Sequence, residues 1–321
     1  MDKISVILCS YKPDFNKLKR TLLSIFRQKE VDVEVVLADD GSIGYDFTDV
    51  KNWIKERIPS NFEIKYSLLE KNVGTIKNIL AALNLVTSKY VKLISPGDYL
   101  NTEYSLKKYY EGLDKGDYSA IFAKAIYFAA EESKCQTINS RAPLLIKPYI
   151  KKWNNKRVLT SLCLFQDYLL GASLAYVTDV FKKHLEELSN SGVKYGEDFS
   201  SLLFAVNNEK IGYIDESLVW YETGLGISNS GESPLVATDK KTLYSSLLPK
   251  YKNIKVINKS INYHEYRNTH SKIKSYIHLF FLSPSLFIKY IDWLFKLKSI
   301  PKKIKVSYHQ EDYKEVFESE I

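Results

Sequence analysis

Apolar residues in the first hundred positions alternate between strand-like runs and helical spacing. Short runs rich in β-branched residues predict four strands, over 4–10, 33–38, 63–68 and 90–94. Between them, apolar positions three and four residues apart predict one helix over 15–26, with Asp14 as its N-cap, and another over 75–86. This alternation is typical of a parallel α/β sheet flanked by helices.

The second part of the chain has a less regular order. We expect two strands, two helices and a short pair of strands, over 118–123 and 172–177, 178–188 and 197–206, and 211–214 with 218–221. From residue 235 onward, Lys, Tyr, Ile and Leu recur at helical periods. The sequence therefore predicts an α/β fold with a mixed, mainly parallel sheet over 1–234 and a helical C-terminal extension over 235–321.

The chain of 321 residues is basic, with a net charge of +8. This charge favours anionic partners such as diphosphates, anionic lipid surfaces or nucleic acid, and does not choose among them. No recognised nucleic-acid-binding motif occurs, so we expect no nucleic acid partner. Three cysteines without a C-x-x-C pair indicate a reducing cytoplasm. We also expect no secretory signal, because the sequence opens on a strand and not on a basic region followed by an apolar stretch. We expect no transmembrane span, because the longest apolar stretch, 276–288, is shorter than the roughly 20 residues required.

Carboxylates follow two of the expected strands. Asp39 and Asp40, with Gly41 and Ser42, come after the strand over 33–38, and Asp98 comes after the strand over 90–94. In open α/β sheets, ligands bind beyond the carboxyl ends of the strands. A divalent cation prefers such oxygens and completes its coordination with water and a substrate diphosphate. We therefore predict a nucleotide-sugar and metal site at this edge.

Five segments support a family resemblance through their order and spacing: ISVILCSYKP, VLADDGS, EKNVGTIKN, LISPGDYL and YGEDFS. Over residues 1 to 230 the chain resembles a family 2 glycosyltransferase of the bacterial cell-surface glycan or glycoprotein type. No single motif is specific, since D-D-G-S alone is more often an ordinary turn after a strand. The resemblance implies a GT-A fold and metal-assisted, inverting transfer of a sugar from a UDP-sugar to a hydroxyl of a glycan, glycolipid or glycoprotein.

By this resemblance, the first two segments bind the nucleotide. Tyr11 lines the base, since an aromatic ring at a strand end can stack on it, and Asp39 accepts a hydrogen bond from a ring N–H of uracil. The alternative for Tyr11 is an ordinary loop. Asp40 is either a further nucleotide contact or a structural cap, and both interpretations stay open.

The third and fourth segments are expected at the diphosphate. Asn72 and Gly74 precede a helix whose first turn carries Lys77, and a helix N-terminus with an ammonium favours a diphosphate. A capped surface helix is the alternative. Asp98 is the predicted ligand of Mn²⁺ or Mg²⁺, with Gly97 beside the ribose. The family usually offers two or three carboxylates here, so this single one lowers the expected metal affinity, and an Asp-capped turn is the alternative.

Glu197 and Asp198 open an apolar helix, where negative charge is also favoured for local reasons. The resemblance implies that Asp198 is the general base that deprotonates the acceptor hydroxyl, and that Glu197 orients the acceptor or is structural. A carboxylate in a partly dry pocket can have a pKa raised toward the working range. Downstream, Gly224 and Gly226 resemble a mobile segment that closes over the substrates.

Lysines interleave with aromatic residues over 276–305. This pattern predicts helices that pack on the main domain or in a homo-oligomer, which we prefer, or that lie on the inner face of an anionic membrane. Two other functions stay open. A nucleotidyltransferase would also use strand-end carboxylates, but the Gly-rich loop expected near its first strand does not occur. A degenerate protein of this fold that binds a glycan or a partner without transfer is compatible with the reduced acidic motif.

Overall fold

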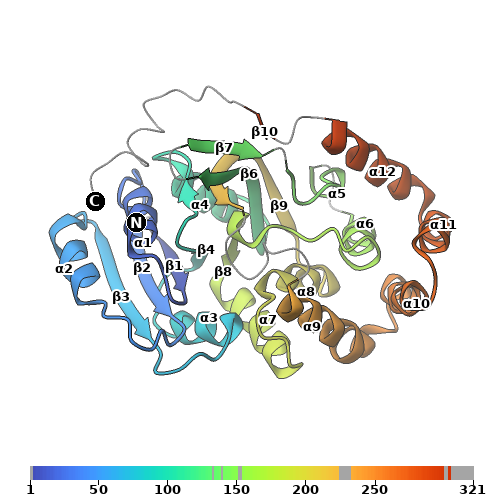
Figure 1. The fold of residues 1–321 in the computed structure, drawn as a ribbon, viewed down its shortest axis with the longest axis horizontal. Coiled ribbons are helices and arrows are strands. Elements are labelled where there is room, and N and C mark those ends of the chain that lie inside the picture. Colours follow the sequence, from blue (N-terminus) through green and yellow to red (C-terminus); the bar gives the residue numbers. More distant parts are fainter. Residues whose placement is uncertain are drawn as a thin grey trace.

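A mixed sheet of ten strands forms the centre of the protein (Figure 1). This count covers the residues that the computed structural model describes, which are 3–131, 134–138, 140–150, 154–223, 233–299 and 303–304. The strand order is β10-β7-β6-β8-β4-β1-β2-β3, with β9 joined to β6 and β5 joined to β9. The predicted α/β fold with a mixed sheet is confirmed.

Four parallel strands form the first half of the sheet. They are β1 (Lys3–Ser10), β2 (Asp32–Asp39), β3 (Phe62–Leu68) and β4 (Tyr90–Ile94). The helices that follow the first three strands are α1 (Phe15–Phe26), α2 (Thr48–Arg57) and α3 (Thr75–Leu83). Asp14 caps α1 as predicted, because its carboxylate accepts the N–H groups of Asn16 and Lys17. In this half, all carboxyl ends of the strands meet at one edge.

The second half of the sheet adds strands of both directions. Its strands are β5 (Tyr99–Leu100), β6 (Ala120–Glu131), β7 (Lys134–Ile138), β8 (Leu174–Val177), β9 (Ile211–Glu222) and β10 (Lys303–Ile304). β8 is antiparallel to both β4 and β6, and β6 is parallel to β9. β9 therefore runs in the direction of β4, and its last residue, Glu222, lies at the same edge as Asp39.

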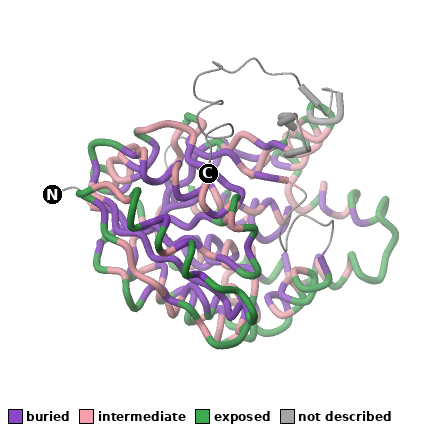
Figure 2. The backbone as a smooth tube through the Cα atoms, turned by 60° about the vertical axis from the view of Figure 1, so that its left-hand side comes forward, coloured by how far each residue is buried: buried purple, intermediate pink, exposed green. Residues whose placement is uncertain are grey.

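Helices cover both faces of the sheet. Besides the first three, they are α4 (Ser105–Lys115), α5 (Lys147–Ile150), α6 (Asn155–Leu159), α7 (Thr178–Asn190) and α8 (Ser200–Val206). Residues of β2 alternate between two apolar clusters, as a strand requires. One cluster contains the buried residues of α1, α2 and α4, and the other contains those of α3, α7 and α8. Figure 2 shows this buried backbone through the central strands.

Some predicted elements differ from the structure. The expected strand pair over 211–214 and 218–221 is one strand, β9, because its pairing with β6 continues through a register shift at Lys124. The expected helix over 197–206 begins as a 3₁₀ turn over Glu197–Phe199. The strand expected from residue 172 begins at Leu174, after a 3₁₀ turn over Gly171–Ser173.

The C-terminal helices lie at the right of Figure 1. They are α9 (Pro234–Thr242), α10 (Lys255–Thr269), α11 (Lys272–Leu282) and α12 (Pro284–Ser299). Leu243, Leu247 and Ile257 belong to the apolar cluster of α3, so the first part of this region packs on the main domain. Ile273, Phe281 and Phe295 are each more than two-thirds exposed. The boundary at 234, assembly and membrane contact stay predictions, and Lys302 and Lys305 lie outside the described residues.

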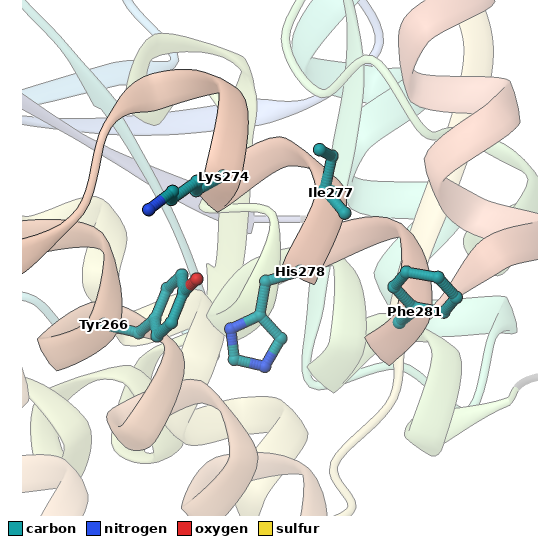
Figure 3. A pocket seen from close by; sticks show the side chains of 5 residues that line it. All are labelled: Tyr266, Lys274, Ile277, His278 and Phe281. Atoms are coloured by element: carbon teal, nitrogen blue, oxygen red, sulfur yellow. The ribbon is translucent and has the colours of Figure 1, made fainter.

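A hollow between α10 and α11 is lined by Tyr266, Lys274, Ile277, His278 and Phe281 (Figure 3). The His278 ring meets the Tyr266 ring edge-on, with 4.4 Å between centroids. In Figure 1 these two helices lie on the opposite side of the molecule from β1, β2 and β3, so the hollow is not part of the predicted nucleotide site. Within the ranges described above, no helix is long and apolar enough to cross a membrane.

Candidate functional site

The carboxyl edge of the sheet brings the predicted site residues together. Ser10 of β1 pairs with Asp39 of β2, and the Ser10 hydroxyl donates to Asp39 Oδ1 at 2.9 Å. Next to Ser10, burial raises the pKa of the Cys9 thiol, and the charges of Glu197 and Asp40 raise it further. Glu197 is therefore near enough to β1 for its charge to act on the Cys9 thiol, although it is far from Cys9 in sequence.

Asp39 fixes the turn after β2. Its Oδ1 also accepts the Ser42 hydroxyl at 2.8 Å, and its Oδ2 accepts the Ser42 backbone N–H at 2.7 Å. Gly41 has φ +67°, and a Cβ there would lie 2.1 Å from the carbonyl carbon of Lys71. The turn therefore requires glycine. Tyr11 is the first residue after β1 and is 48% exposed. The Lys12 ammonium lies 5.3 Å from the centroid of its ring.

Asp40 holds the segment before α3. Its Oδ1 accepts the Val73 N–H at 2.7 Å, and its Oδ2 accepts the Gly74 N–H at 3.0 Å and the Asn72 side-chain amide at 2.9 Å. These three bonds hold Asn72, Val73 and Gly74 in place before α3. Burial raises the pKa of the Asp40 carboxyl, and the two backbone bonds oppose that rise. Lys77, in the first turn of α3, is exposed.

Asp98 lies in a tight turn between β4 and β5. Its side chain is 6% exposed, and its Oδ1 accepts the Glu222 backbone N–H at 3.1 Å. Gly97 has φ +100°, and its N–H donates to the Thr21 hydroxyl at 3.1 Å. Burial raises the pKa of Asp98 to about 7, while the Glu222 N–H and the charge of Lys92 oppose that rise. Asp98 is thus held against the end of β9.

Sequence reasoning missed an ion pair at this point. The Lys17 ammonium, from α1, lies 2.7 and 2.9 Å from the two carboxylate oxygens of Glu222. A Cβ on Gly97 would lie 2.4 Å from Glu222 Oε2, so the pair sits directly against Gly97. Lys17 and Glu222 are 205 positions apart. The available signal was that Glu222 follows an apolar strand run, as Asp39 does.

Lys92 is a second missed cation. It lies fully buried in β4, where its ammonium donates at 2.6 Å to the carbonyls of both Leu93 and Ala172. Desolvation lowers its pKa to about 7, while the charges of Asp98 and Cys9 raise it. Its signal was a lysine in the middle of an apolar strand. Lys92 therefore ties β4 to the segment before β8.

Glu197 and Asp198 are adjacent carboxyls in the 3₁₀ turn before α8. Burial raises the pKa of both carboxyls, and the Asp198 charge raises that of Glu197 further. A Cβ on Gly171 would lie 2.5 Å from Glu197 Oε1, so this glycine leaves room for the carboxylate. Gly171 therefore lies against the predicted acidic pair.

Asp239, from α9, holds the segment before this pair. Its Oδ2 accepts the N–H groups of Tyr195 and Gly196 at 2.6 and 2.9 Å, and its Oδ1 accepts that of Lys194 at 3.1 Å. The Lys194 carbonyl in turn accepts the Ile76 N–H at 2.9 Å. The segment held by Asp40 and the segment held by Asp239 are therefore bonded to each other. No sequence signal distinguished Asp239 from a surface carboxylate.

Two further parts of the expected site are the metal ion and the mobile segment that closes over the substrates. Over the described ranges, no group of three or more His, Cys, Asp or Glu side chains is placed to hold a metal ion. The glycine-containing segment expected to close over the substrates, with Gly224 and Gly226, lies outside the described residues. The roles of Tyr11, Asp39, Asp40, Asn72, Gly74, Lys77, Gly97, Asp98, Glu197 and Asp198 stay predictions.

Comparisons with known proteins agree with this architecture. Residues 5–169 match the family model described as Glycosyl transferase family 2. Over 229 residues the chain is 27% identical to Glycosyltransferase GlyA of Streptococcus pneumoniae serotype 4, a match that covers 70% of this chain and 31% of that protein. The fold is similar to that of S. aureus TarS 1-349 in complex with UDP-GlcNAc, with a TM-score of 0.50, 18% identity, and coverage of 81% of this chain and 72% of that one.

The raised pKa of Glu197 predicts a stability effect. The folded state binds this proton more tightly than the unfolded chain, so ionisation above the ordinary pKa of 4.5 lowers the free energy of unfolding. Glu197→Gln should therefore be more stable than the wild type at pH 8, by about 1 to 2 kcal/mol, and not at pH 4. Thermal unfolding at both pH values measures this, with the exposed Glu186→Gln as control. A constant difference across pH would contradict it.

Proposed function

The chain belongs to glycosyl transferase family 2 and has the GT-A fold, and we propose that it transfers a sugar from a UDP-sugar to a hydroxyl of a glycan, glycolipid or glycoprotein. The complex of the S. aureus neighbour with UDP-GlcNAc supports the choice of donor. The observation that carries the proposal is the location of the Glu197–Asp198 pair. Its carboxyls have raised pKa values, and the charge of Glu197 acts on Cys9, the neighbour in β1 of Ser10, which pairs with Asp39.

The uridine nucleotide is proposed to bind across the ends of β1 and β2. The exposed ring of Tyr11 offers a stacking surface for the base. Asp39 Oδ2 accepts one hydrogen bond from the described residues, and a carboxylate oxygen has two lone pairs, so it can also accept the ring N–H of uracil. The diphosphate is assigned to Lys77, whose exposed ammonium can pair with it, beside Asn72 and Gly74, which Asp40 holds in place.

A divalent cation, Mn²⁺ or Mg²⁺, would be held by Asp98 together with diphosphate oxygens and water, and it would offset the charge of the departing UDP. The chemistry of Asp98 fits this task, since it is a carboxylate at the strand edge. The charge of Lys92, buried in β4, opposes the rise of the Asp98 pKa. Gly97 presents its backbone beside the ribose.

Asp198 is proposed to act as the general base. It takes the proton of the acceptor hydroxyl while that oxygen bonds to the anomeric carbon and the bond from this carbon to UDP breaks. One such displacement inverts the anomeric carbon. Burial raises the pKa of both carboxyls, and the Asp198 charge raises that of Glu197 further. Protonated Glu197 can therefore donate a hydrogen bond that orients the acceptor while Asp198 stays ionised.

The first test is nucleotide selectivity. UDP should raise the melting temperature more than GDP or ADP, because Tyr11 and Asp39 match a uracil edge, and Mn²⁺ should enlarge the effect through Asp98. Binding to the folded state alone stabilises it by about 2.7 kcal/mol at 100 times the dissociation constant, so the shift is measurable. Equal shifts for the three nucleotides, with and without Mn²⁺, would argue against the proposed donor.

The second test concerns the base. Asp198→Asn should leave UDP binding nearly intact while lowering acceptor-dependent release of UDP by roughly 10² to 10⁴, the range for loss of a general base. Glu186→Gln, an exposed change on α7, should have no effect. If Asp198→Asn kept normal turnover, the base would lie elsewhere, and Glu197 would be the first residue to examine.

A further inference from the structure

The ion pair of Lys17 and Glu222 lies at the metal end of the proposed donor site. The Lys17 side chain is 27% exposed and that of Glu222 is 5% exposed, so the carboxylate is desolvated while its partner reaches solvent. The ammonium lies within 2.9 Å of both carboxylate oxygens. A buried carboxylate requires a cation nearby, and here α1 supplies it.

The backbone places Glu222 beside Asp98. The Glu222 N–H donates to Asp98 Oδ1 at 3.1 Å, so the two acidic residues are joined by a hydrogen bond. Gly97 has no Cβ, and Glu222 Oε2 occupies the space in which one would lie. The turn from Ser95 to Asp98 is thus shaped to admit a second carboxylate from β9. Its own sequence supplies one carboxylate, Asp98.

We propose that Glu222 is the second carboxylate ligand of the divalent cation, and that the Lys17 ammonium occupies its place until that cation binds. The inference rests on the proposed function, because it extends the donor site. Carboxylate oxygens are the protein ligands that Mg²⁺ and Mn²⁺ use beside substrate phosphates. An ammonium against both oxygens of Glu222 shows that the position accepts a cation.

The Lys17 ammonium is able to move away from the Glu222 carboxylate, whereas the Lys92 ammonium is fixed in the sheet. Lys92 is fully buried and donates to two carbonyls, so it is a fixed part of the sheet. Lys17 projects from the first turn of α1 on a flexible side chain that is partly in solvent. A divalent ion carries twice the charge of the ammonium, and it therefore competes for Glu222 while Lys17 turns toward solvent or the incoming diphosphate.

The experiment measures the affinity of Mn²⁺ alone, without nucleotide, by calorimetric titration of the full chain. Lys17→Met removes the competing cation and should tighten Mn²⁺ binding by about tenfold or more, since tenfold needs only about 1.4 kcal/mol. Glu222→Gln should weaken it by about tenfold or more. Lys19→Met is the matched control, because Lys19 is on the same helix and its ammonium lies 5.9 Å from the Trp53 ring centroid. This variant should bind Mn²⁺ with the affinity of the wild type.

Tighter Mn²⁺ binding in Lys17→Met is the deciding result, because a misfolded variant loses affinity for Mn²⁺ and does not gain it. Adding Asp98→Asn to Lys17→Met should remove the gain, which places the ion between the two carboxylates. Unchanged or weaker Mn²⁺ binding in Lys17→Met would overturn the inference. If the wild type still binds UDP selectively in that case, the inference fails and the proposed function stands, whereas loss of selectivity for UDP would count against the function itself.

Discussion

Hydrogen bonds from backbone N–H groups to two buried aspartates are the constraint on which the candidate site depends. Asp40 binds the segment before α3, and Asp239 binds the segment before the Glu197–Asp198 pair. The bond from the Ile76 N–H to the Lys194 carbonyl joins these two segments. The proposed nucleotide end and the proposed base are therefore parts of one hydrogen-bonded body that reaches from β2 to α9.

Charge at this edge is balanced within the chain. Glu222 has Lys17 as its partner, and Asp98 lies within the influence of Lys92. Burial raises the pKa of Asp98, Glu197 and Asp198 alike. The Asp198 charge raises the pKa of Glu197 further, while the charge of Lys240 lowers that of Asp198. The ion pair with Lys17 therefore suits Glu222 to the proposed binding of a cation, while two adjacent buried carboxyls with raised pKa values suit the proposed proton transfer.

The sequence predicted those features that depend on local pattern. Strands β1 to β4 and helices α1 and α3 follow from apolar spacing, and parallel topology then brings Asp39 and Asp98 to one edge. The helix α2 was not predicted, since its charged residues dilute the apolar period. The helix α4 was missed although Leu106, Tyr109 and Leu113 recur at helical spacing. The contacts of Lys17 with Glu222 and of Asp239 with Tyr195 join distant segments, and their partners follow only from the packing of α1 and α9.

Amide hydrogen exchange in the ligand-free protein tests the central claim, that this edge is assembled before substrates bind. The account predicts that the N–H groups of Gly74, Ile76 and Gly196 exchange as slowly as those of β2, and that Asp239→Asn speeds exchange at both Gly196 and Ile76. Exchange of these amides in the wild type at the rate of exposed loops would show that the two segments are not held together, and would contradict the account.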